Sequence, residues 1–550
     1  MLKRTLFIAI VIFAFTFMGC HKEEQHSSPT LPSLHLTMTS MQLDSIMADN
    51  DCKVSAFAEL IDSDGDTLFQ GNLAHIKTRG NFTLLEAKKS FVIKFQEKRK
   101  LFGLEKSRSF VLLANPCDES HIRNAIGLDL ARALGIPASR YAYLTLYING
   151  AYNGLYQMTN KVDVGKRTLD ITDLDKLNQQ ANQKPIKDYE WFGVGRKKEA
   201  ILRKGVLLEQ NPEDITGGYL LDNTGPVSDY RKSISGFVSD ADDNIRIRSP
   251  KYASPQEVNY IAGRYNEMEK AVHSPDGINP ETGKHYSEYI DVESFARYYL
   301  LNELLYNHDG GWSSFMMYKD SDSIDPKIYA GPAWDYDRTL DNPRFQQRYL
   351  MIIHELHVNK RHGIFGQAHS GGLLYHLCKH TDFQQAVKTI YINEVSAACH
   401  EYIANSPIDS LYHYLCQEAD HDNSFHGNRF SADYEAATRS AIDFLNKRIE
   451  FFDWYFSSDE QVHATYQAKN RKTRNFYFPI EEAIHAPQLE KLYNRTPIYE
   501  LYYAGTDSIV PDGTVFHKSQ ELELRKRPPT KHEVQTRRIK KKLAKFGIKI

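Results

Sequence analysis

The repeat of apolar residues along this chain changes from a period of two to a period near 3.6 about halfway along. Between residues 32 and 160, apolar and polar residues alternate in short runs that end at turn residues, which is the pattern of strands with one buried face. From Pro255 onward, apolar residues recur every three or four positions, as on one face of a helix. The sequence therefore predicts an α+β protein with a sheet-rich N-terminal lobe and a mostly helical C-terminal lobe.

The first half contains several candidate strands and one candidate helix. Asn149-Gly150 lies between two alternating runs and predicts a hairpin, because this dipeptide suits a two-residue turn. An amphipathic helix is expected between Ser120, a candidate N-cap, and Gly135, which would end it. The predicted strands are Ser90 to Phe95, Phe110 to Leu113, Tyr143 to Ile148, Ala151 to Met158 and Gly218 to Leu221.

Helices dominate the prediction for the second half. A helix from Pro255 would bury one face, a second would start at Asp291 as N-cap and run to about Tyr306, and further helices would fill residues 373 to 456. The face of the first of these helices consists of Val258, Ile261, Tyr265, Met268 and Val272.

The same patterns divide the chain into parts. We expect a leader at 1–20, a polar tether at 21–31, the sheet-rich lobe at 32–250 with an insertion or long loop at about 165–215, and the helical lobe at 251–460. A C-terminal extension at 461–550 has strand-like pieces near 499–503 and 514–516 and then a basic tail. For that tail a solvated, disordered end is favoured over contact with an anionic surface.

The N-terminus has the features of a leader. A charged start and an apolar run from Leu6 to Met18 precede Gly19-Cys20, as in a secretory signal peptide. The junction resembles the lipobox of bacterial lipoproteins, in which Cys20 would be lipidated; the alternative is an uncleaved membrane anchor. The following Lys-Glu-Glu step resembles the surface-export signal of Bacteroidetes lipoproteins. We therefore expect a lipid-anchored protein of the cell envelope, at the outer membrane and exposed on the surface.

Bulk charge argues against one class of partner. The chain has 68 basic and 70 acidic residues and a formal net charge of -2, so it lacks the positive field that wraps nucleic acid. No nucleic-acid partner is expected.

Acidic residues lie on both sides of a predicted hairpin in the helical half. The helix from Asp291 ends before Asn307 and Asp309, two strand-like runs follow, and then come Asp335 and Asp337. A hairpin places the loops at its two ends side by side, so these residues should share one cleft. Carboxylate and amide oxygens suit Mg²⁺, which binds through one or two carboxylates and substrate phosphates. Protein kinases have the same order of parts, but the alternative is that these residues only cap helices and turns.

The chain resembles the spore coat protein H (CotH) kinase family over roughly residues 32 to 456. Seven short stretches occur in the order of that family: Lys77-Thr78-Arg79-Gly80-Asn81 with Lys88-Lys89-Ser90-Phe91; Leu101-Phe102-Gly103; Leu112-Leu113-Ala114-Asn115; Leu146-Tyr147-Ile148-Asn149-Gly150 with Gly154-Leu155-Tyr156; Gly217-Gly218-Tyr219-Leu220-Leu221; Asn302-Glu303 with Asn307-His308-Asp309; and Gly331-Pro332-Ala333-Trp334-Asp335-Tyr336-Asp337. The resemblance implies a divergent two-lobed protein-kinase-like fold.

That resemblance also implies an activity and roles for the acidic residues. It implies binding of ATP with Mg²⁺ or Mn²⁺, and phosphorylation of Ser or Thr on secreted or envelope proteins. On the matching positions, Asp309 would orient or deprotonate the acceptor hydroxyl. Asp335, with Asp337 and Asn307, would hold the metal across the phosphates, where charge and positioning supply most of the catalysis.

Cations for the phosphates should come from the sheet-rich lobe. Arg79 is one candidate, because Gly80 beside it lets the backbone approach a ligand. Lys89 and Lys94 are the other candidates, but they point to opposite faces of a strand, so at most one should line the site.

Two departures from the family keep other functions open. Asn160 stands where a Glu is expected after the hairpin, and Asp222-Asn223 replaces a Glu-rich ending. A catalytically silent binding or assembly protein of the envelope, and a metal-dependent phosphohydrolase that uses the same carboxylates, are therefore alternatives. The run His354-Glu355-Leu356-His357 lacks zinc-protease spacing, and these histidines are expected on a surface loop.

Overall fold

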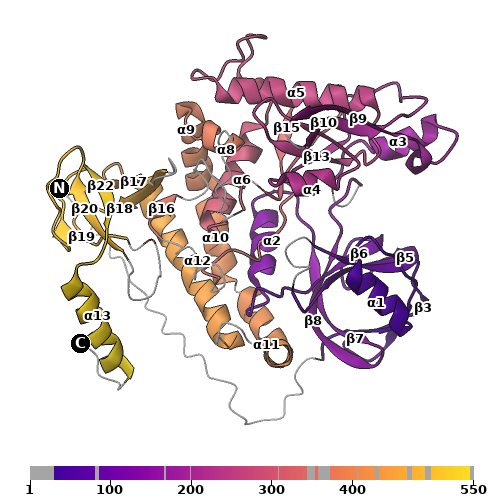
Figure 1. Ribbon diagram of the computed structural model, residues 1–550, viewed down its shortest axis with the longest axis horizontal. Coiled ribbons are helices and arrows are strands. Elements are labelled where there is room, and N and C mark those ends of the chain that lie inside the picture. The colour runs from indigo at the N-terminus through magenta and orange to yellow at the C-terminus, as the bar shows by residue number, and fades with distance from the viewer. Residues whose placement is uncertain are drawn as a thin grey trace, which may run out of the picture.

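The computed structural model describes most of the chain, and the described part contains four sheets and a helical region (Figure 1). The described ranges are 30–80, 86–165, 169–197, 200–307, 309–311, 313–342, 353–356, 372–405, 407–427, 433–467, 473–487, 489 and 497–545. The leader and the lipidation prediction at Cys20 lie outside these ranges.

The N-terminal sheet has eight strands in the order β3-β2-β1-β7-β8-β6-β5-β4. It is antiparallel except for the parallel pair β1 and β7, and it curls around its own apolar core, with helix α1 (Ser40–Ala48) lying against β4. The strands are β1 (Ser33–Thr37), β2 (Phe57–Ile61), β3 (Thr67–Asn72), β4 (His75–Arg79), β5 (Ser90–Arg99), β6 (Ser107–Leu113), β7 (Tyr141–Ile148) and β8 (Ala151–Asn160). The sheet-rich N-terminal region is thus confirmed.

The turn between β7 and β8 has the predicted form. Ile148 pairs with Ala151, and Asn149 and Gly150 both have positive φ, 52° and 79°, as a two-residue hairpin turn requires. Helix α2 (Arg123–Ala133) starts later than expected, with Ile122 as N-cap and no side-chain cap. Ser120 is not the cap: its Oγ accepts from the Ile122 N–H, which precedes the helix, and the first helical N–H, that of Arg123, donates to Asp118.

A second sheet of seven strands joins segments from both predicted lobes, in the order β15-β14-β11-β13-β12-β10-β9. The hairpin β9–β10 comes from the stretch expected as an insertion or long loop, which also contains helix α3 (Leu174–Ala181). Because β14 pairs with β11, the boundary expected at residue 250 divides this sheet. The strands are β9 (Trp191–Lys197), β10 (Ala200–Val206), β11 (Tyr219–Asn223), β12 (Ser235–Val238), β13 (Asn244–Ser249), β14 (Phe315–Lys319) and β15 (Ile328–Ala330).

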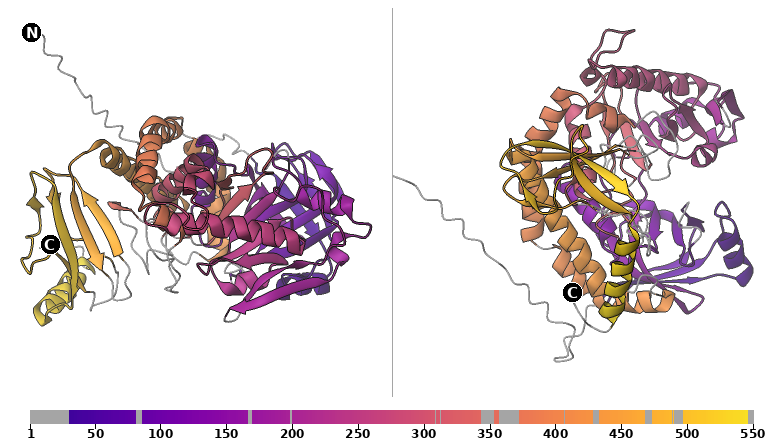
Figure 2. Two further views of the ribbon diagram at one scale, coloured as in Figure 1. Left: turned by 90° about the horizontal axis from the view of Figure 1, so that it is seen from above. Right: turned by 60° about the vertical axis from the view of Figure 1, so that its left-hand side comes forward.

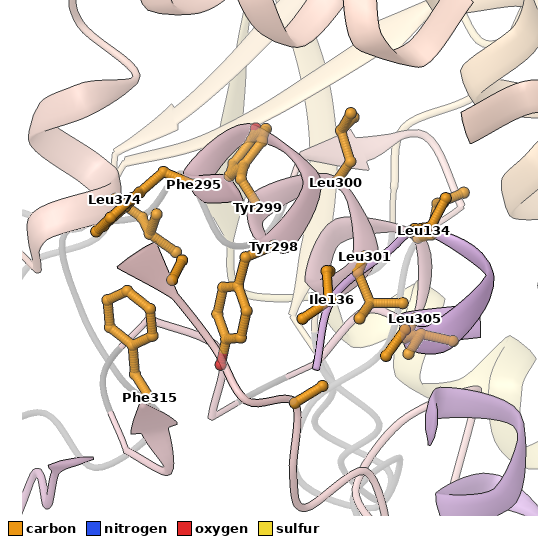
Figure 3. Packing of buried hydrophobic residues seen from close by; sticks show 14 of the residues in the cluster. Leu134, Ile136, Phe295, Tyr298, Tyr299, Leu300, Leu301, Leu305, Phe315 and Leu374 are labelled. Atoms are coloured by element: carbon orange, nitrogen blue, oxygen red, sulfur yellow. The ribbon is translucent and has the colours of Figure 1, made fainter. Parts of the chain in front are cut away.

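Helices form most of the region from residue 255 to 457 and are confirmed there. All five predicted face residues of α5 are buried, and α6 has the predicted N-cap, Asp291. Figure 3 shows side chains of α6 packed with Leu134 and Ile136, which follow α2, and with Phe315 of β14. The helices are α5 (Pro255–His273), α6 (Val292–Leu304), α8 (Leu373–Leu377), α9 (Thr381–Ile390), α10 (Ser396–Ala404), α11 (Pro407–His426) and α12 (Tyr434–Ser457).

The C-terminal extension contributes four strands to a five-stranded sheet at one end of the molecule (Figure 2), whose edge strand is β16, and its strands β19 (Ala483–Ile484) and β21 (Thr514–Val515) form a sheet of two. Two expectations are corrected here. His354 is half-buried between Phe451 and Phe478 rather than on an open surface loop, and His357 lies outside the described residues. The next residue, Glu355, starts strand β16, which pairs with β18, and its buried carboxylate binds Arg474 of β18. The basic tail forms a helix, α13, whose first turn is held by Glu533. The elements are β16 (Glu355–Leu356), β18 (Thr473–Phe478), β17 (Val462–Gln467), β22 (Gln520–Arg527), β20 (Ile498–Tyr503) and α13 (Lys531–Lys545).

None of the helices in the described part of the chain has the length and the apolar run that a bilayer crossing requires.

Candidate active site

A cavity of about 670 Å³ lies where the first sheet, the second sheet and the two acidic loops meet, within the size range of small-molecule sites. Arg79 and Val92 line it from the first sheet, and Arg246 and Arg248 from the second. The two acidic loops contribute Asp309, Ser313, Ser314, Trp334, Asp335, Asp337 and Arg338 to the lining.

The hairpin β14–β15 brings the three predicted carboxylates together. Asp309 lies beyond the end of α6, and Asp335 and Asp337 follow β15. Burial and the neighbouring Asp335 raise the pKa of Asp337 to about 7. Burial likewise raises the pKa of Asp309, against the opposing charge of Arg338. The order of helix, loop, hairpin and loop was enough to predict this grouping.

Asp309 has one oxygen engaged and one without a partner. Arg338 Nη1 lies 3.2 Å from Asp309 Oδ2. Asp309 Oδ1 is buried and has no hydrogen-bond partner among the described residues. A buried carboxylate oxygen without a donor is costly, which suits a group that binds a cation or an acceptor hydroxyl.

Asn307 is placed differently from the carboxylates. It is buried and its amide is engaged: Nδ2 donates to Asn302 Oδ1 at 2.8 Å, and Oδ1 accepts from the Asp309 backbone N–H at 3.1 Å. It does not line the described cavity. Here Asn307 shapes the loop that carries Asp309.

Asp335 adopts an unusual backbone conformation, with φ of 74°. Residues other than glycine rarely take such values, and they do so most often where the surroundings hold them at a functional site. The Ser314 hydroxyl donates to Asp335 Oδ2 at 2.9 Å, so the two acidic loops are joined directly.

Helix α2 and the chain before it hold the second acidic loop in place. Asn124 donates to Asn115 Oδ1 at 3.0 Å and accepts from the Tyr336 backbone N–H at 2.7 Å. Arg123 Nε donates to the carbonyl of Thr339 at 3.0 Å. Sequence reasoning missed Asn124 and Arg123; Asn115 belongs to one of the family stretches, but no role followed from that.

The structure brings one of the three predicted cations to the cavity. Arg79 ends β4 and lies over the Trp334 ring, with 5.3 Å between Cζ and the ring centroid. Lys94 shares a strand face with Val92 but lies further along β5, and neither Lys94 nor Lys89 lines the described cavity. The deeply buried lysine of this segment is Lys88, which pairs with Asp422 of α11 at 2.8 Å.

Two cations that line the cavity were missed from the sequence. Arg246 and Arg248 alternate with Ile245 and Ile247 along β13, and both isoleucines are buried. This alternation was a usable signal, because it places two guanidinium groups on one face of a strand.

The cavity residues also bear on metal binding. Among the described residues, no three His, Cys, Asp or Glu side chains lie close enough to hold a metal ion by themselves. Mg²⁺ in nucleotide sites needs only one or two carboxylates besides the phosphates, and the pair Asp335 and Asp337 fits such a partial ligand set.

The curled sheet, the helical region and the acidic loops on either side of a hairpin define a kinase-fold protein. The family model for the CotH kinase protein matches residues 76–452, and the chain belongs to that family. A search of curated proteins found no match. Among solved structures, the crystal structure of the Helicobacter pylori proinflammatory kinase CtkA matches at 11% identity with a TM-score of 0.20, over 64% of this chain and 94% of that one.

Proposed function

We propose that this protein is an ATP-dependent protein kinase that transfers phosphate to Ser or Thr of secreted or envelope proteins. The observation that supports this most is that one cavity carries both signs of charge. Arg79, Arg246 and Arg248 line it from the two sheets, and Asp309, Asp335 and Asp337 line it from the two acidic loops. A triphosphate needs cations along it, and the reacting end needs carboxylates for a metal and for the acceptor.

Each acidic residue has a distinct part in this proposal. Asp335 and Asp337 would hold Mg²⁺ or Mn²⁺, which when bound neutralises charge on the phosphate oxygens. Asp309 orients the acceptor hydroxyl and accepts its proton through Oδ1, the oxygen that no described residue binds. Arg338, bound to Oδ2, keeps that carboxylate in place.

One observation favours a second candidate, a catalytically silent envelope protein of the same fold. Asn160, found where a Glu is expected, donates to the Glu105 carbonyl at 2.9 Å and accepts from the Glu105 N–H at 3.0 Å. Its side chain therefore joins two segments of the first sheet and supplies no carboxylate for a nucleotide-binding lysine.

Calorimetric titration of ATP with Mg²⁺ or Mn²⁺ into residues 21–550 tests the proposal. Asp335→Ala should abolish metal-dependent binding, whereas Asp512→Ala, an exposed carboxylate of the C-terminal extension, should leave it unchanged. No binding by the parent chain would contradict the nucleotide site.

Labelled ATP then separates the activities. Label transferred to Ser or Thr of secreted proteins supports the kinase, and phosphate released without protein labelling supports the phosphohydrolase. Binding without turnover supports the silent protein.

We also propose that Cys20 anchors the protein to the cell envelope, at the outer membrane. Metabolic labelling with a palmitate analogue should mark the parent chain and not Cys20→Ser. Equal labelling of both would remove this part of the proposal.

A further inference from the structure

Three guanidinium groups line the sheet side of the cavity, from two different sheets. Arg79 ends β4, and Arg246 and Arg248 lie on one face of β13. Their charges are close enough to act on one another: burial chiefly lowers the pKa of Arg79 to about 10, and Arg248 and Arg246 add to that effect while Asp335 opposes it. A guanidinium group does not lose its proton in proteins, so positive charge is gathered here at a cost.

Asp222 of β11 holds the two β13 arginines. It is 1% exposed, and its Oδ2 accepts from Arg246 Nη2 and, at 2.8 Å, from Arg248 Nε. Burial alone would raise the pKa of Asp222, but the two guanidinium groups outweigh it and keep the pKa below its usual value. The carboxylate is therefore ionised and fixes both arginines beside the cavity.

A single carboxylate does not balance this group. Among the described residues, seven basic and five acidic side chains line the cavity, and three of the acidic ones come from the two acidic loops. Lys77, Lys161 and Lys232 also line the cavity, but they pair with Asp51, Asp163 and Asp229. Each guanidinium has five N–H donors, Asp222 accepts from only one nitrogen of each, and the buried Arg246 Nε has no hydrogen-bond partner among the described residues.

We propose that Arg79, Arg246 and Arg248 bind the triphosphate of the nucleotide, with Asp222 as the residue that positions the two β13 arginines. Arginine presents paired donors that match phosphate oxygens, and the site faces the carboxylates that would act at the reacting end. This inference rests on the proposed nucleotide-dependent function. The phosphates are then bound by arginines of β4 and β13, and not by Lys89 or Lys94.

The test compares three probes on the mature chain by calorimetry: ATP with Mg²⁺, inorganic tripolyphosphate, and adenosine. The double variant Arg246→Gln/Arg248→Gln should weaken ATP and tripolyphosphate binding at least tenfold and leave adenosine binding unchanged. It should also reduce the dependence of ATP affinity on salt, since fewer charge contacts remain. The matched control is Arg196→Gln/Arg203→Gln, which removes two arginines of β9 and β10 that do not line the cavity.

A single variant that keeps the charge is included in case the double variant does not fold. Arg248→Lys keeps the charge but loses the paired donors, and an intermediate loss of ATP and tripolyphosphate affinity is expected. Thermal unfolding of every variant shows whether the fold is intact.

The outcomes separate this inference from the proposed function. Unchanged ATP and tripolyphosphate affinity in folded variants would overturn the inference and leave nucleotide binding standing. Tripolyphosphate binding that the double variant loses, in a chain that does not bind ATP, would support the anion site and overturn its assignment to a nucleotide. Intact ATP binding with lost transfer to an acidic acceptor peptide would assign the arginines to the acceptor and overturn the inference.

Discussion

Gly127 is the residue at which helix α2 touches the second acidic loop. A Cβ at this position would overlap the ring of Tyr336, which lies between Asp335 and Asp337. The absence of a side chain at one helix position thus lets the loop with two predicted metal ligands lie against the helix.

Gly127→Ala should therefore displace Tyr336, lower the free energy of unfolding by about 1–3 kcal/mol and weaken metal-dependent ATP binding. Gly263→Ala is the matched control, because this helical glycine of α5 has open space around its Cβ position. That variant should gain up to about 1 kcal/mol in stability through helix propensity. Calorimetry and thermal unfolding measure both effects, and normal ATP binding by Gly127→Ala would contradict the packing argument.

A second prediction at this scale concerns the protonation of Asp337. Burial and Asp335 raise its pKa to about 7, and a carboxyl must lose its proton to bind a metal. Metal-dependent ATP affinity should therefore fall as the pH drops from 8 to 6. In Asp337→Asn the affinity should be lower and its pH dependence flatter. Both proteins share the titration of the nucleotide itself, so identical pH profiles would show that Asp337 is not a ligand.

At the scale of elements, the first turn of α5 contains a buried carboxyl group. Glu257 completes a capping box with Ser254, and its Oε2 also accepts from Asn178 at 3.1 Å. The side chain is fully buried, and burial raises its pKa to about 7. The pKa of Glu257 is higher in the folded state than in the unfolded state. The stability that comes from its protonation is therefore fully present at a pH below the unfolded-state pKa, and it is lost as the pH rises through 7.

Glu257→Gln keeps an acceptor for the cap and removes the charge. Relative to the parent chain, the variant should gain stability between pH 5 and pH 8, by roughly 1–3 kcal/mol. Chemical denaturation at the two pH values measures the difference. A constant offset between the two proteins would contradict a raised pKa of Glu257 in the folded protein.

At the scale of the whole molecule, one buried ion pair joins the first sheet to the helical region. Lys88 and Asp422 are 3% and 4% exposed and lie 2.8 Å apart. Asp422 also accepts from the Leu155 N–H, and Lys88 donates to the Leu155 carbonyl. Gly154 allows this approach of β8 to α11, since a Cβ there would overlap Asp422.

Removal of one partner should leave the other charge buried without compensation. Lys88→Met is expected to cost about 3–5 kcal/mol in the free energy of unfolding. Lys388→Met, which breaks an exposed pair with Asp459, should cost at most about 1 kcal/mol. Urea denaturation compares them, and equal effects would show that Lys88 does not hold the two parts together.

Local signals in the sequence were sufficient for much of this protein. The hydrophobic period predicted the first sheet and helices α5 and α6, and the Asn149-Gly150 turn predicted β7–β8, because these features depend on neighbouring residues and on backbone geometry. The same reasoning grouped Asp309, Asp335 and Asp337, since a hairpin necessarily brings its two ends together. The predicted start of α2 was wrong, because the carboxylate of Asp118, and not the Ser120 hydroxyl, accepts the first helical N–H.

Only the tertiary structure decided which cations line the cavity and which residues hold them in place. Arg246 and Arg248 face Arg79 only because β13 lies in a second sheet beside the first, and Asp222 holds them only because β11 pairs with β13. Lys88 does not line the cavity, and its ammonium group binds Asp422, which is distant in the chain. The sequence by itself therefore determined the elements and the acidic loops, while contacts between distant strands and helices determined the charge that faces those loops, because such contacts have no local pattern.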